Sequence, residues 1–527
     1  MRYDIAVIGG SLGGVQAAIS AARENKRVYL CEESDWVGGQ LTSQGVPPDE
    51  HSWIEAFGGT ERYREFRQSV RDYYRALPEF DVDAAKAAWG FGDEVAPEGC
   101  FSPGNAWVSR IPHEPEVAVR LLEGMMQEYI RDGRIILEYM TVANGSVVED
   151  DCIRSVTVRS LKTGEEKTVE AEFFIDATDC GDLLPIVGAE YRVGAESREE
   201  TGEPDAADMA DPEDMQAITW VAALEMVPEG QDWEAVKPEK YDYYASLEIP
   251  HVGCKQFGWY TNNLQGPGIR KLGMYDGEGD NGVGGLWNYR RIIDTPNFRD
   301  GRNEVTLFNW PQNDYYMGNI IDDPDKEKHL QEARDLTLCA VYWLQTQALR
   351  PDGGRGYRVR LCPSVMGTGD GLAKMPYIRE SRRIVALRTI REQEIVRDYA
   401  DKPFTVEDSV GVGHYSMDLH LTTRSNSHFM AHTYPFEIPF SAMVPVRLKN
   451  LLPACKNIGC THLTGGCYRL HPVEWNIGEV AGYAAAYCMD REITPAELTE
   501  KSRMKIFQQY LQERGIQLHW DFSKMRL

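Results

Sequence analysis

Apolar and polar positions at the start of the chain follow the pattern of a strand, a turn, a helix and a second strand. Residues 5–8 form a short apolar run, a glycine-rich turn fills 9–14, an alanine-rich stretch follows at 15–24, and residues 28–31 are apolar again. Short apolar runs bounded by turn residues are typical of buried strands. Two strands joined by a crossover helix lie parallel in nearly all cases, so the pattern predicts an α/β fold with a parallel sheet.

Further helices and strands are expected over the first 195 residues. Helical spacing of apolar residues is seen at 54–76 and at 117–131, and a strand follows at 135–137. Residues 141–174 alternate in the manner of a small β meander, which ends in the apolar run 173–175. We expect this last run to return the chain to the sheet.

The middle of the chain has a different pattern. Residues 196–214 are acidic and nearly free of large apolar side chains, which predicts a surface loop. Residues 215–440 are rich in aromatic residues and glycine, and contain one clear helix near 326–349. After 440 the α/β pattern returns, with a strand at 451–454 and a helix at 472–489.

These changes divide the chain into a nucleotide-binding domain in two parts and an inserted domain that faces the substrate. We expect the first part at 1–195, the inserted mixed α+β domain at 215–440, the second part at 441–490 and a C-terminal helical segment at 491–527. A chain of 527 residues exceeds the size of one ordinary hydrophobic core, which agrees with more than one domain.

Composition narrows the function classes. The chain has 56 Lys and Arg against 82 Asp and Glu, a net charge of −26, so a nucleic-acid partner would meet a repulsive field. No apolar run approaches the roughly 18 residues of a membrane span, and no leader precedes the first strand. We therefore expect a cytoplasmic protein with no membrane and no nucleic-acid partner. The 11 cysteines fit reduced thiols, and their spacings match no metal-ligand pattern, so we expect no metal.

The glycine turn and the acid that follows it predict a dinucleotide site. Gly9 permits the tight turn from strand to helix, Gly14 lets the helix pack on the sheet, and the helix start offers N–H groups to a pyrophosphate. Glu32 ends the second strand, where it can accept hydrogen bonds from ribose hydroxyls. Ser11 departs from the pattern at the position of the middle glycine, and we expect Gly10 and Gly13 to compensate.

Two more glycine motifs extend this pattern. Gly38 and Gly39 follow Glu32 at the spacing seen in two-dinucleotide-binding-domain flavoproteins, and residues 175–182 form a second turn after a strand. With the dense stretch 450–479, these motifs resemble the FAD-dependent oxidoreductase family within the glutathione-reductase-like flavoproteins. The resemblance covers most of the chain and implies a Rossmann-like FAD-binding domain with FAD as cofactor. It does not imply a particular substrate.

The resemblance also implies which residues contact FAD, including the start of the last long helix. Pro472 suits the first turn of that helix, whose N-terminus would favour negative charge on the reduced flavin. The expected cofactor contacts are Gly9, Gly10, Ser11, Gly13, Gly14, Glu32, Glu33, Gly38, Gly39, Gln40, Leu41, Ala177, Thr178, Asp179, Glu474, Trp475, Asn476 and Ile477. Covalent and noncovalent attachment of the flavin both stay open.

Candidate catalytic groups come from the histidines, because imidazole titrates near neutral pH and can remove a hydroxyl proton as hydride leaves carbon. His471, His462 and His414 are the candidates that we retain, and His420 lies in similar surroundings. Arg469 could orient a carboxylate or sugar oxygens through its planar guanidinium. Each of these residues could equally be structural.

We therefore expect an FAD-dependent oxidoreductase that takes a hydride from a small hydroxylated, sugar-like or organic-acid substrate onto flavin N5. No second nucleotide fingerprint is present, so oxygen, a quinone or a protein carrier is the expected electron acceptor. A dehydrogenase, an oxidase and a monooxygenase stay open, and the chain could form a homo-oligomer. The alternatives are an electron-relay flavoprotein without its own small substrate and a nonredox polysaccharide-active protein with a vestigial nucleotide fold.

Overall fold

A five-stranded parallel sheet forms the base of the molecule. The computed structural model describes residues 2–87, 99–263, 268–280 and 282–525. The strand order is β22-β7-β1-β2-β3, with bounds Leu451–Pro453, Phe173–Asp176, Ile5–Ile8, Val28–Glu32 and Ile135–Tyr139. All four neighbouring pairs are parallel, which confirms the α/β, Rossmann-like fold class. The sheet joins a strand near residue 450 to strands from the first 176 residues.

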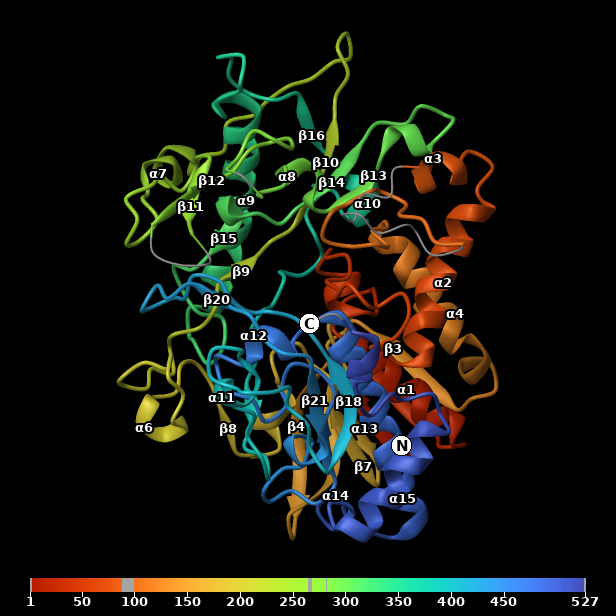
Figure 1. Ribbon diagram of the computed structural model, residues 1–527. Coiled ribbons are helices and arrows are strands. Elements are labelled where there is room, and N and C mark those ends of the chain that lie inside the picture. The colour runs from red at the N-terminus through yellow and green to blue at the C-terminus, as the bar shows by residue number, and fades with distance from the viewer. Residues whose placement is uncertain (1, 88–98, 264–267, 281, 526–527) are drawn as a thin grey trace.

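Two helices from opposite ends of the sequence pack against each other beside this sheet (Figure 1). They are α1 (Leu12–Arg23) and α13 (His471–Arg491). A Cβ added to Gly478 would lie 2.2 Å from the carbonyl oxygen of Gly13, and one added to Gly482 would lie 2.2 Å from that of Ala17. Only glycine permits backbones to approach this closely, so the small-residue face of α13 sets the distance between the helices.

Two further helices and a small sheet surround the parallel sheet. Helix α4 (Pro115–Arg131) contacts α1 and α2 (Glu61–Ala76). The helix expected from residue 54 begins only at Glu61, because Gly58 and Gly59 precede the N-cap Thr60, whose side chain accepts from Tyr63 N–H. The expected meander is a three-stranded antiparallel sheet, β4 (Thr141–Glu149), β5 (Cys152–Ser160) and β6 (Glu166–Glu170).

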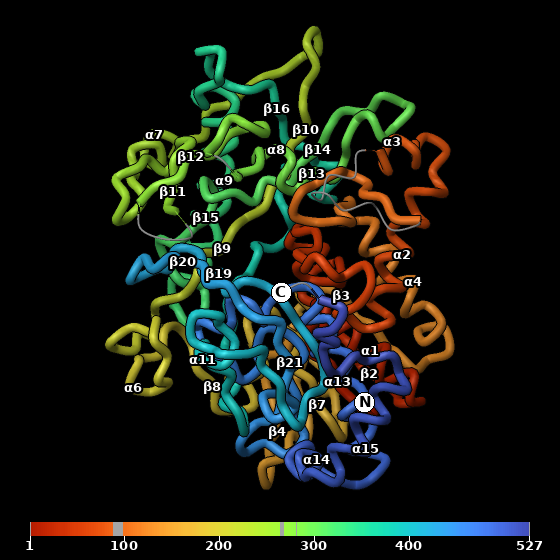
Figure 2. The backbone as a smooth tube through the Cα atoms, in the orientation of Figure 1, coloured from red at the N-terminus to blue at the C-terminus, as the bar shows by residue number. Residues whose placement is uncertain are grey.

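The middle of the chain forms a second region above the parallel sheet in the view of Figure 1. Its antiparallel sheet has the order β13-β14-β10-β16, with bounds Arg291–Ile293, Val305–Phe308, Ala222–Met226 and Val359–Leu361. The helix α9 (Lys326–Thr346) contacts β16 and buries Leu336, Ala340 and Leu344. In Figure 2 the backbone of this region is mostly green, whereas the red N-terminal and blue C-terminal segments of the chain lie below it.

Short strand pairs lie between and around these two regions. The pairs are β9 (Ile218–Thr219) with β15 (Asp314–Tyr315), β11 (Tyr260–Asn262) with β12 (Ile269–Lys271), β18 (Ser409–Gly413) with β21 (Phe436–Pro439), β19 (Met417–Leu419) with β20 (Phe429–Ala431), and β8 (Tyr191–Arg192) with β17 (Arg383–Ile384). The short helices are α3 (Val82–Ala87), α5 (Leu183–Ile186), α6 (Arg198–Thr201), α7 (Tyr241–Ser246), α8 (Leu286–Tyr289), α10 (Pro363–Met366), α11 (Glu392–Ile395) and α12 (Gly465–Tyr468).

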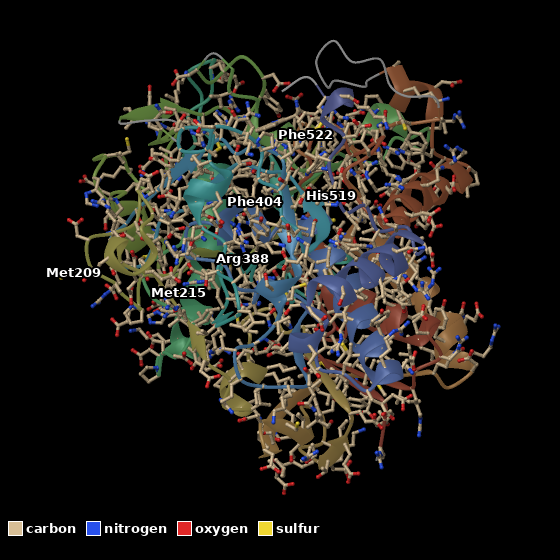
Figure 3. The ribbon with its side chains drawn as sticks, turned by 60° about the horizontal axis from the view of Figure 1, so that its bottom comes forward. Met209, Met215, Arg388, Phe404, His519 and Phe522 are labelled. Carbon is tan, nitrogen blue, oxygen red and sulfur yellow. The ribbon has the colours of Figure 1, made fainter. Side chains whose placement is uncertain are left out.

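The acidic segment 196–214 is a surface loop only in part. Met209 projects from the edge of the molecule, whereas Met215 just after the segment points inward (Figure 3). Glu196 is buried in an ion pair with Arg383, and Glu203 is buried as an acceptor for Thr461 Oγ1. Two acidic residues of this segment, Glu196 and Glu203, therefore connect it to the rest of the fold, which the acidic composition did not predict.

The C-terminal segment is helical, as expected, but in two pieces. Helix α14 (Pro495–Leu498) begins at a capping box formed by Thr494 and Glu497, and α15 (Lys501–Gln512) follows. All eleven cysteines are free thiols. Within the parts of the chain that the structure describes, no helix combines the length and apolar character needed to cross a bilayer.

Candidate active site

A cavity of about 290 Å³ opens at the carboxyl ends of β1, β2 and β7. Its walls include Gly9, Glu32 and Glu33 from the first βαβ unit, and Thr178 and Asp179 from the turn after β7. Ligands of open α/β sheets bind at this edge, because the loops that follow neighbouring strands meet there. The cavity therefore lies where the sequence predicts the dinucleotide.

Gly9 lets two of these loops approach each other. It has a φ of +98°, and an added Cβ would lie 2.4 Å from the backbone of Ala177. Both the left-handed conformation and the close contact exclude a side chain at this position. The turn after β1 and the turn after β7 are thus held together at the mouth of the cavity.

The N-terminus of α1 is capped by Ser11 rather than blocked by it. The Ser11 Oγ accepts a hydrogen bond from the backbone N–H of Gly14 at 3.3 Å. Among the described residues, the N–H groups of Ser11 and Leu12 have no acceptor, and both residues are buried. Unpaired N–H groups at the start of a helix attract a phosphate, and here they accompany a cavity of suitable position.

Glu32 fixes the loops beside the cavity. One carboxylate oxygen accepts from Gly10 N–H at 2.8 Å and the other from Ser34 N–H at 2.9 Å. Burial raises the pKa of Glu32 to about 8, although the hydrogen bonds from Ser34 oppose the shift. Its predicted contact with a ribose stays a prediction, since the observed partners are backbone groups.

The start of α13 connects to the cavity through three side chains. The Glu474 carboxylate accepts from Gly13 N–H at 3.2 Å and from the Gln40 amide. The ammonium group of Lys456 lies 2.5 Å from Asp179 and 3.7 Å from Glu474. Lys456 is buried, and the two carboxylates raise its pKa well above the usual range although burial opposes this. Lys456 was not a candidate from sequence, because nothing local marks it.

The predicted cofactor residues are placed in two groups. Those that line the cavity are Gly9, Glu32, Glu33, Ala177, Thr178 and Asp179. Those that are buried and do not line the cavity are Gly10, Ser11, Gly13, Gly14, Gly38, Gly39, Gln40, Leu41 and Glu474. Asn476 points away, since its amide donates to Val410 carbonyl oxygen, and the Trp475 ring packs on Tyr63 and Phe66. Ile477 is buried in the core.

These observations fit FAD. The cavity, the two unpaired N–H groups and the close backbone contact at Gly9 are the features that an adenine dinucleotide requires at the first crossover. Figure 1 shows α1 and α13, which carry the two helix starts, side by side next to the sheet.

A second group of polar side chains lies beyond Tyr377 from this cavity. Pro376 and Ile378 line the cavity, while the Tyr377 hydroxyl accepts from Arg469 at 2.7 Å. We call the group behind it the His420 cluster. Its members are Asp314, Asp418, His420, His428 and Arg469.

Charge pairing orders the His420 cluster. His420 Nδ1 lies 2.6 Å from Asp314 Oδ2, and Nε2 lies 3.5 Å from Asp418. Arg379 bonds the other oxygen of Asp314 at 3.0 Å, and Arg379 and His420 hold the pKa of Asp314 well below its usual range despite burial. Asp314 is buried, whereas the side chain of His420 is 25% exposed. Asp314 therefore orients the imidazole, and part of the ring remains accessible to solvent.

A model of the FAD dependent oxidoreductase family matches residues 4–511. The chain belongs to this family. It is thus an FAD-dependent oxidoreductase, and the family model confirms FAD as the cofactor. The match does not specify the substrate or the electron acceptor.

Comparison with individual proteins adds little to this assignment. No curated protein matches the chain. Solved structures with a similar trace include a myxobacterial FAD-dependent halogenase, CndH (12% identity over 98% of this chain and 83% of that chain, TM-score 0.32), the OxyS anhydrotetracycline hydroxylase of Streptomyces rimosus (11%, 98% and 68%, 0.34) and Sdh1 of Mycobacterium smegmatis in complex with UQ1 (13%, 97% and 76%, 0.31). We draw nothing about the reaction of this oxidoreductase from them.

His471 has no free ring nitrogen in this oxidoreductase. Its Nδ1 accepts from Asp49 N–H at 3.1 Å, so Nε2 carries the hydrogen and donates to Val46 carbonyl oxygen at 3.0 Å. Burial lowers the pKa of His471 to about 3. A neutral imidazole with both nitrogens bonded to backbone supports the loop 46–49 and has no lone pair for a substrate proton.

The other two histidine candidates are largely buried, and only His462 is held by an ion pair. His462 Nδ1 lies 2.9 Å from Glu380, which pairs with Arg383, and His462 is buried. The His414 ring lies 5.1 Å from that of Trp53 at a tilt of 49°, its Nδ1 is buried without a hydrogen-bond partner among the described residues, and burial lowers its pKa to about 4. Within the described chain, neither side chain forms a hydrogen bond or an ion pair with a residue of the cavity wall. Arg469 belongs to the His420 cluster and donates to Tyr377.

Sequence reasoning passed over Asp314 and did not retain His420. The only local signal is the Asp418-x-His420 spacing on and after β19, which places both side chains on one face of an extended segment. Asp314 comes from β15, 106 positions earlier, and no sequence pattern marks that pairing.

Proposed function

We propose that this FAD-dependent oxidoreductase oxidises a small polar substrate that carries a hydroxyl group, and that His420 accepts the hydroxyl proton. When bound, FAD supplies the acceptor for two electrons and a hydrogen from the substrate carbon. The hydroxyl proton must leave as the carbon–oxygen single bond becomes a carbonyl. A histidine oriented by a buried carboxylate suits that task.

The observation that carries this proposal is the position of the Asp314–His420 pair. Because Nδ1 contacts Asp314, Nε2 is the ring nitrogen that is left for a substrate, and its charged neighbour is the carboxylate of Asp418. Asp418 lies 3.5 Å from Nε2, longer than an ordinary hydrogen bond, so a substrate hydroxyl has room to compete for it.

A short chain of contacts connects His420 to the cofactor cavity. Arg469 is near Asp418 at 3.8 Å and bonds Tyr377, which separates the cavity residues Pro376 and Ile378. The carbonyl oxygen of Arg469 accepts from Gln40, which also bonds Glu474. Asp418, Arg469 and Tyr377 thus connect the proposed base to the cofactor side.

The experiment is an absorbance spectrum of the purified protein, followed by anaerobic bleaching of the flavin with matched polyols, sugars and hydroxy acids. We expect one compound class to bleach the flavin. His420→Gln should leave the oxidised spectrum unchanged and slow bleaching by roughly 100-fold or more. His251→Gln, at an exposed histidine outside the cluster, is the control and should bleach at the wild-type rate.

Two outcomes would contradict the proposal. Bleaching of the His420→Gln variant at the wild-type rate would remove His420 as the base. Reduction by a protein carrier alone, with no response to any small compound, would favour an electron-relay flavoprotein. Once a substrate is known, oxygen, a quinone and a protein carrier can each be tested for reoxidation.

A further inference from the structure

Segments from the middle of the chain form part of the wall of the cofactor cavity. The residues that they contribute include Trp220, Ile320, Lys326, Leu330, Met375 and Ile378. These residues line the same cavity as Gly9 and Thr178, which come from the turns after β1 and β7. None of the six was expected to contact the cofactor, because no local pattern relates them to the glycine turn. The cavity is thus enclosed by two separate parts of the chain.

Two backbone N–H groups fasten one of these segments to the first part of the chain. The N–H of Met375 donates to the carbonyl oxygen of Ser43 at 2.9 Å. The N–H of Ile378 donates to the side-chain oxygen of Gln44 at 3.1 Å. Ser43 and Gln44 also line the cavity. The two parts of the chain are therefore joined at the cavity wall itself.

Arg382 anchors the start of α9 to the turn that follows β7. Its guanidinium lies 2.8 Å from Asp182 in that turn and 2.8 Å from Asp322, which precedes α9 by four positions. The guanidinium also donates to the carbonyl oxygen of Cys180 at 2.8 Å. Cys180 and Asp182 both line the cavity, so this anchor holds the first turn of α9 at the cavity wall.

Lys326 is the first residue of α9 and, among the described residues that line the cavity, the one with a positive charge. Its side chain is partly buried, and its ammonium group forms no hydrogen bond and no ion pair with the parts of the chain that the structure describes. Two acids of the same wall have other partners, since Asp182 pairs with Arg382 and Asp179 with Lys456. A cation without a counterion on a cavity wall is available to an anionic ligand.

Lys326 keeps its charge at neutral pH. Burial lowers its pKa, but Cys180 and the carboxylates of Asp182 and Glu33 raise it by more, so the net shift is upward. Glu33 lines the cavity as well, yet it forms no ion pair with Lys326. Burial raises the pKa of Glu32 on the same wall to about 8, which reduces the negative charge that a phosphate meets at neutral pH.

We propose that Lys326 binds the diphosphate of FAD, so that the start of α9 completes the cofactor site. The diphosphate is negatively charged at neutral pH, and an ammonium group is a regular phosphate ligand in proteins. The N–H groups of Ser11 and Leu12 offer hydrogen bonds to a phosphate but only part of a positive charge, so Lys326 supplies what the glycine turn lacks. The role of Lys326 rests on FAD as the cofactor and is independent of the role proposed for His420.

The test is calorimetric titration of the full chain, freed of flavin, with FAD, ADP and adenosine. ADP carries the adenosine and the two phosphates of FAD, whereas adenosine carries no phosphate. Lys326→Gln should weaken the binding of FAD and ADP by roughly 10- to 100-fold, because a charge-assisted hydrogen bond is lost, and should leave adenosine binding unchanged. Lys326→Arg keeps the charge and should bind ADP within about threefold of the wild type.

Lys328→Gln is the matched control, because it removes the same charge from the same helix. Lys328 is exposed, does not line the cavity and pairs with Asp325 at 3.6 Å. Exposed pairs of this kind contribute little, and salt screens an exposed charge from a buried ligand. The control should therefore change none of the three affinities.

Hydrogen exchange of the wild type gives a second readout, which needs no substitution and so does not depend on the folding of a variant. The first N–H groups of a helix have no partner within the helix and exchange readily. A ligand held by Lys326 should slow exchange in peptides that cover residues 320–330. We expect this protection with FAD and with ADP, and not with adenosine.

Three results would overturn the role of Lys326. They are equal ADP affinity of Lys326→Gln and the wild type, an equal loss of affinity for adenosine and ADP in that variant, and exchange at residues 320–330 that ADP does not slow. The two proposals fail separately. Unchanged ADP binding in Lys326→Gln, in a protein whose flavin is bleached through His420, would contradict only the role of Lys326. Weakened ADP binding in Lys326→Gln, in a protein whose flavin no small compound bleaches, would contradict only the proposed oxidation.

Discussion

The cofactor cavity and the His420 cluster are built in different ways. Around the cavity, glycines bring backbones together, and the groups offered to a ligand are largely main-chain N–H groups and carboxylates at strand ends. In the cluster, side chains from β15, from β19 and from the segments that follow β19 and α12 meet in charge pairs. The cofactor cavity is shaped by close contacts between backbones, and the His420 cluster by electrostatic pairing of side chains.

This difference shows where specificity can reside. A backbone site depends on the main chain, so it tolerates few sequences and suits a cofactor that a whole family shares. A side-chain cluster can change its ligand by changing one charge. The following experiments test whether the two regions respond differently to small perturbations.

The largest effect is expected at Gly13, where an added Cβ would lie 1.6 Å from the carbonyl oxygen of Ala454. Gly13→Ala should cost more than about 4 kcal/mol of unfolding free energy and abolish FAD retention, because backbone must move apart. Urea denaturation measures the unfolding free energy, and the flavin-to-protein absorbance ratio measures FAD retention. Gly124→Ala in α4, whose Cβ would meet nothing within 4 Å, should instead gain up to about 1 kcal/mol.

Breaking the charge pairing should rank second. Asp314→Ala leaves Arg379 and His420 without their buried partner, and we expect a loss of roughly 3 kcal/mol in unfolding free energy. Glu116→Ala, which breaks the exposed pair with Arg120, should cost less than about 0.5 kcal/mol. Similar costs for the two variants would show that the cluster is not held by its ion pairs.

His471 gives a pH-dependent test on the cofactor side. Its pKa is about 3 in the folded protein against 6.5 as the ordinary value, so the unfolded chain binds the extra proton and stability falls as the pH drops below 6.5. Between pH 7.5 and 5.5 this residue should contribute a loss of about 1.4 kcal/mol. His471→Gln should reduce the pH dependence by that amount in denaturation curves. A slope equal to that of the wild type would contradict the buried neutral state.

Ser11 should show the smallest effect. Its hydroxyl caps α1, so Ser11→Ala should cost about 1 kcal/mol, whereas Ser11→Gly should cost only a few tenths. FAD titration checks whether the glycine variant binds the cofactor at least as well. A glycine variant that costs as much as the alanine one would mean that Ser11 stabilises the turn by something other than capping.

Local patterns predicted much of the cofactor side. The turn at 9–14, Glu32 and the helix near 472–489 could be predicted because strand, turn and helix preferences act over a few residues. The start of α2 was misplaced, since apolar spacing continued across Gly58 and Gly59 and gave no sign of the Thr60 cap. The two buried glutamates of the acidic segment were missed because their partners, Arg383 and Thr461, lie far along the chain.

The choice among histidines could not be made from sequence. A histidine becomes a base, an ion-pair partner or a buried support through what its two nitrogens contact. His471 contacts backbone of the loop 46–49, and His420 contacts Asp314. These partners are set by how distant segments pack, which no local spacing records.

The sequence alone therefore determined the βαβ unit, the glycine turn and the family of the chain, because short-range backbone requirements restrict which residues can stand there. Only the tertiary structure decided which charges are paired with each other. Electrostatic pairing depends on distance in space, and the fold brings Asp314, Arg379 and His420 into contact from three separate segments.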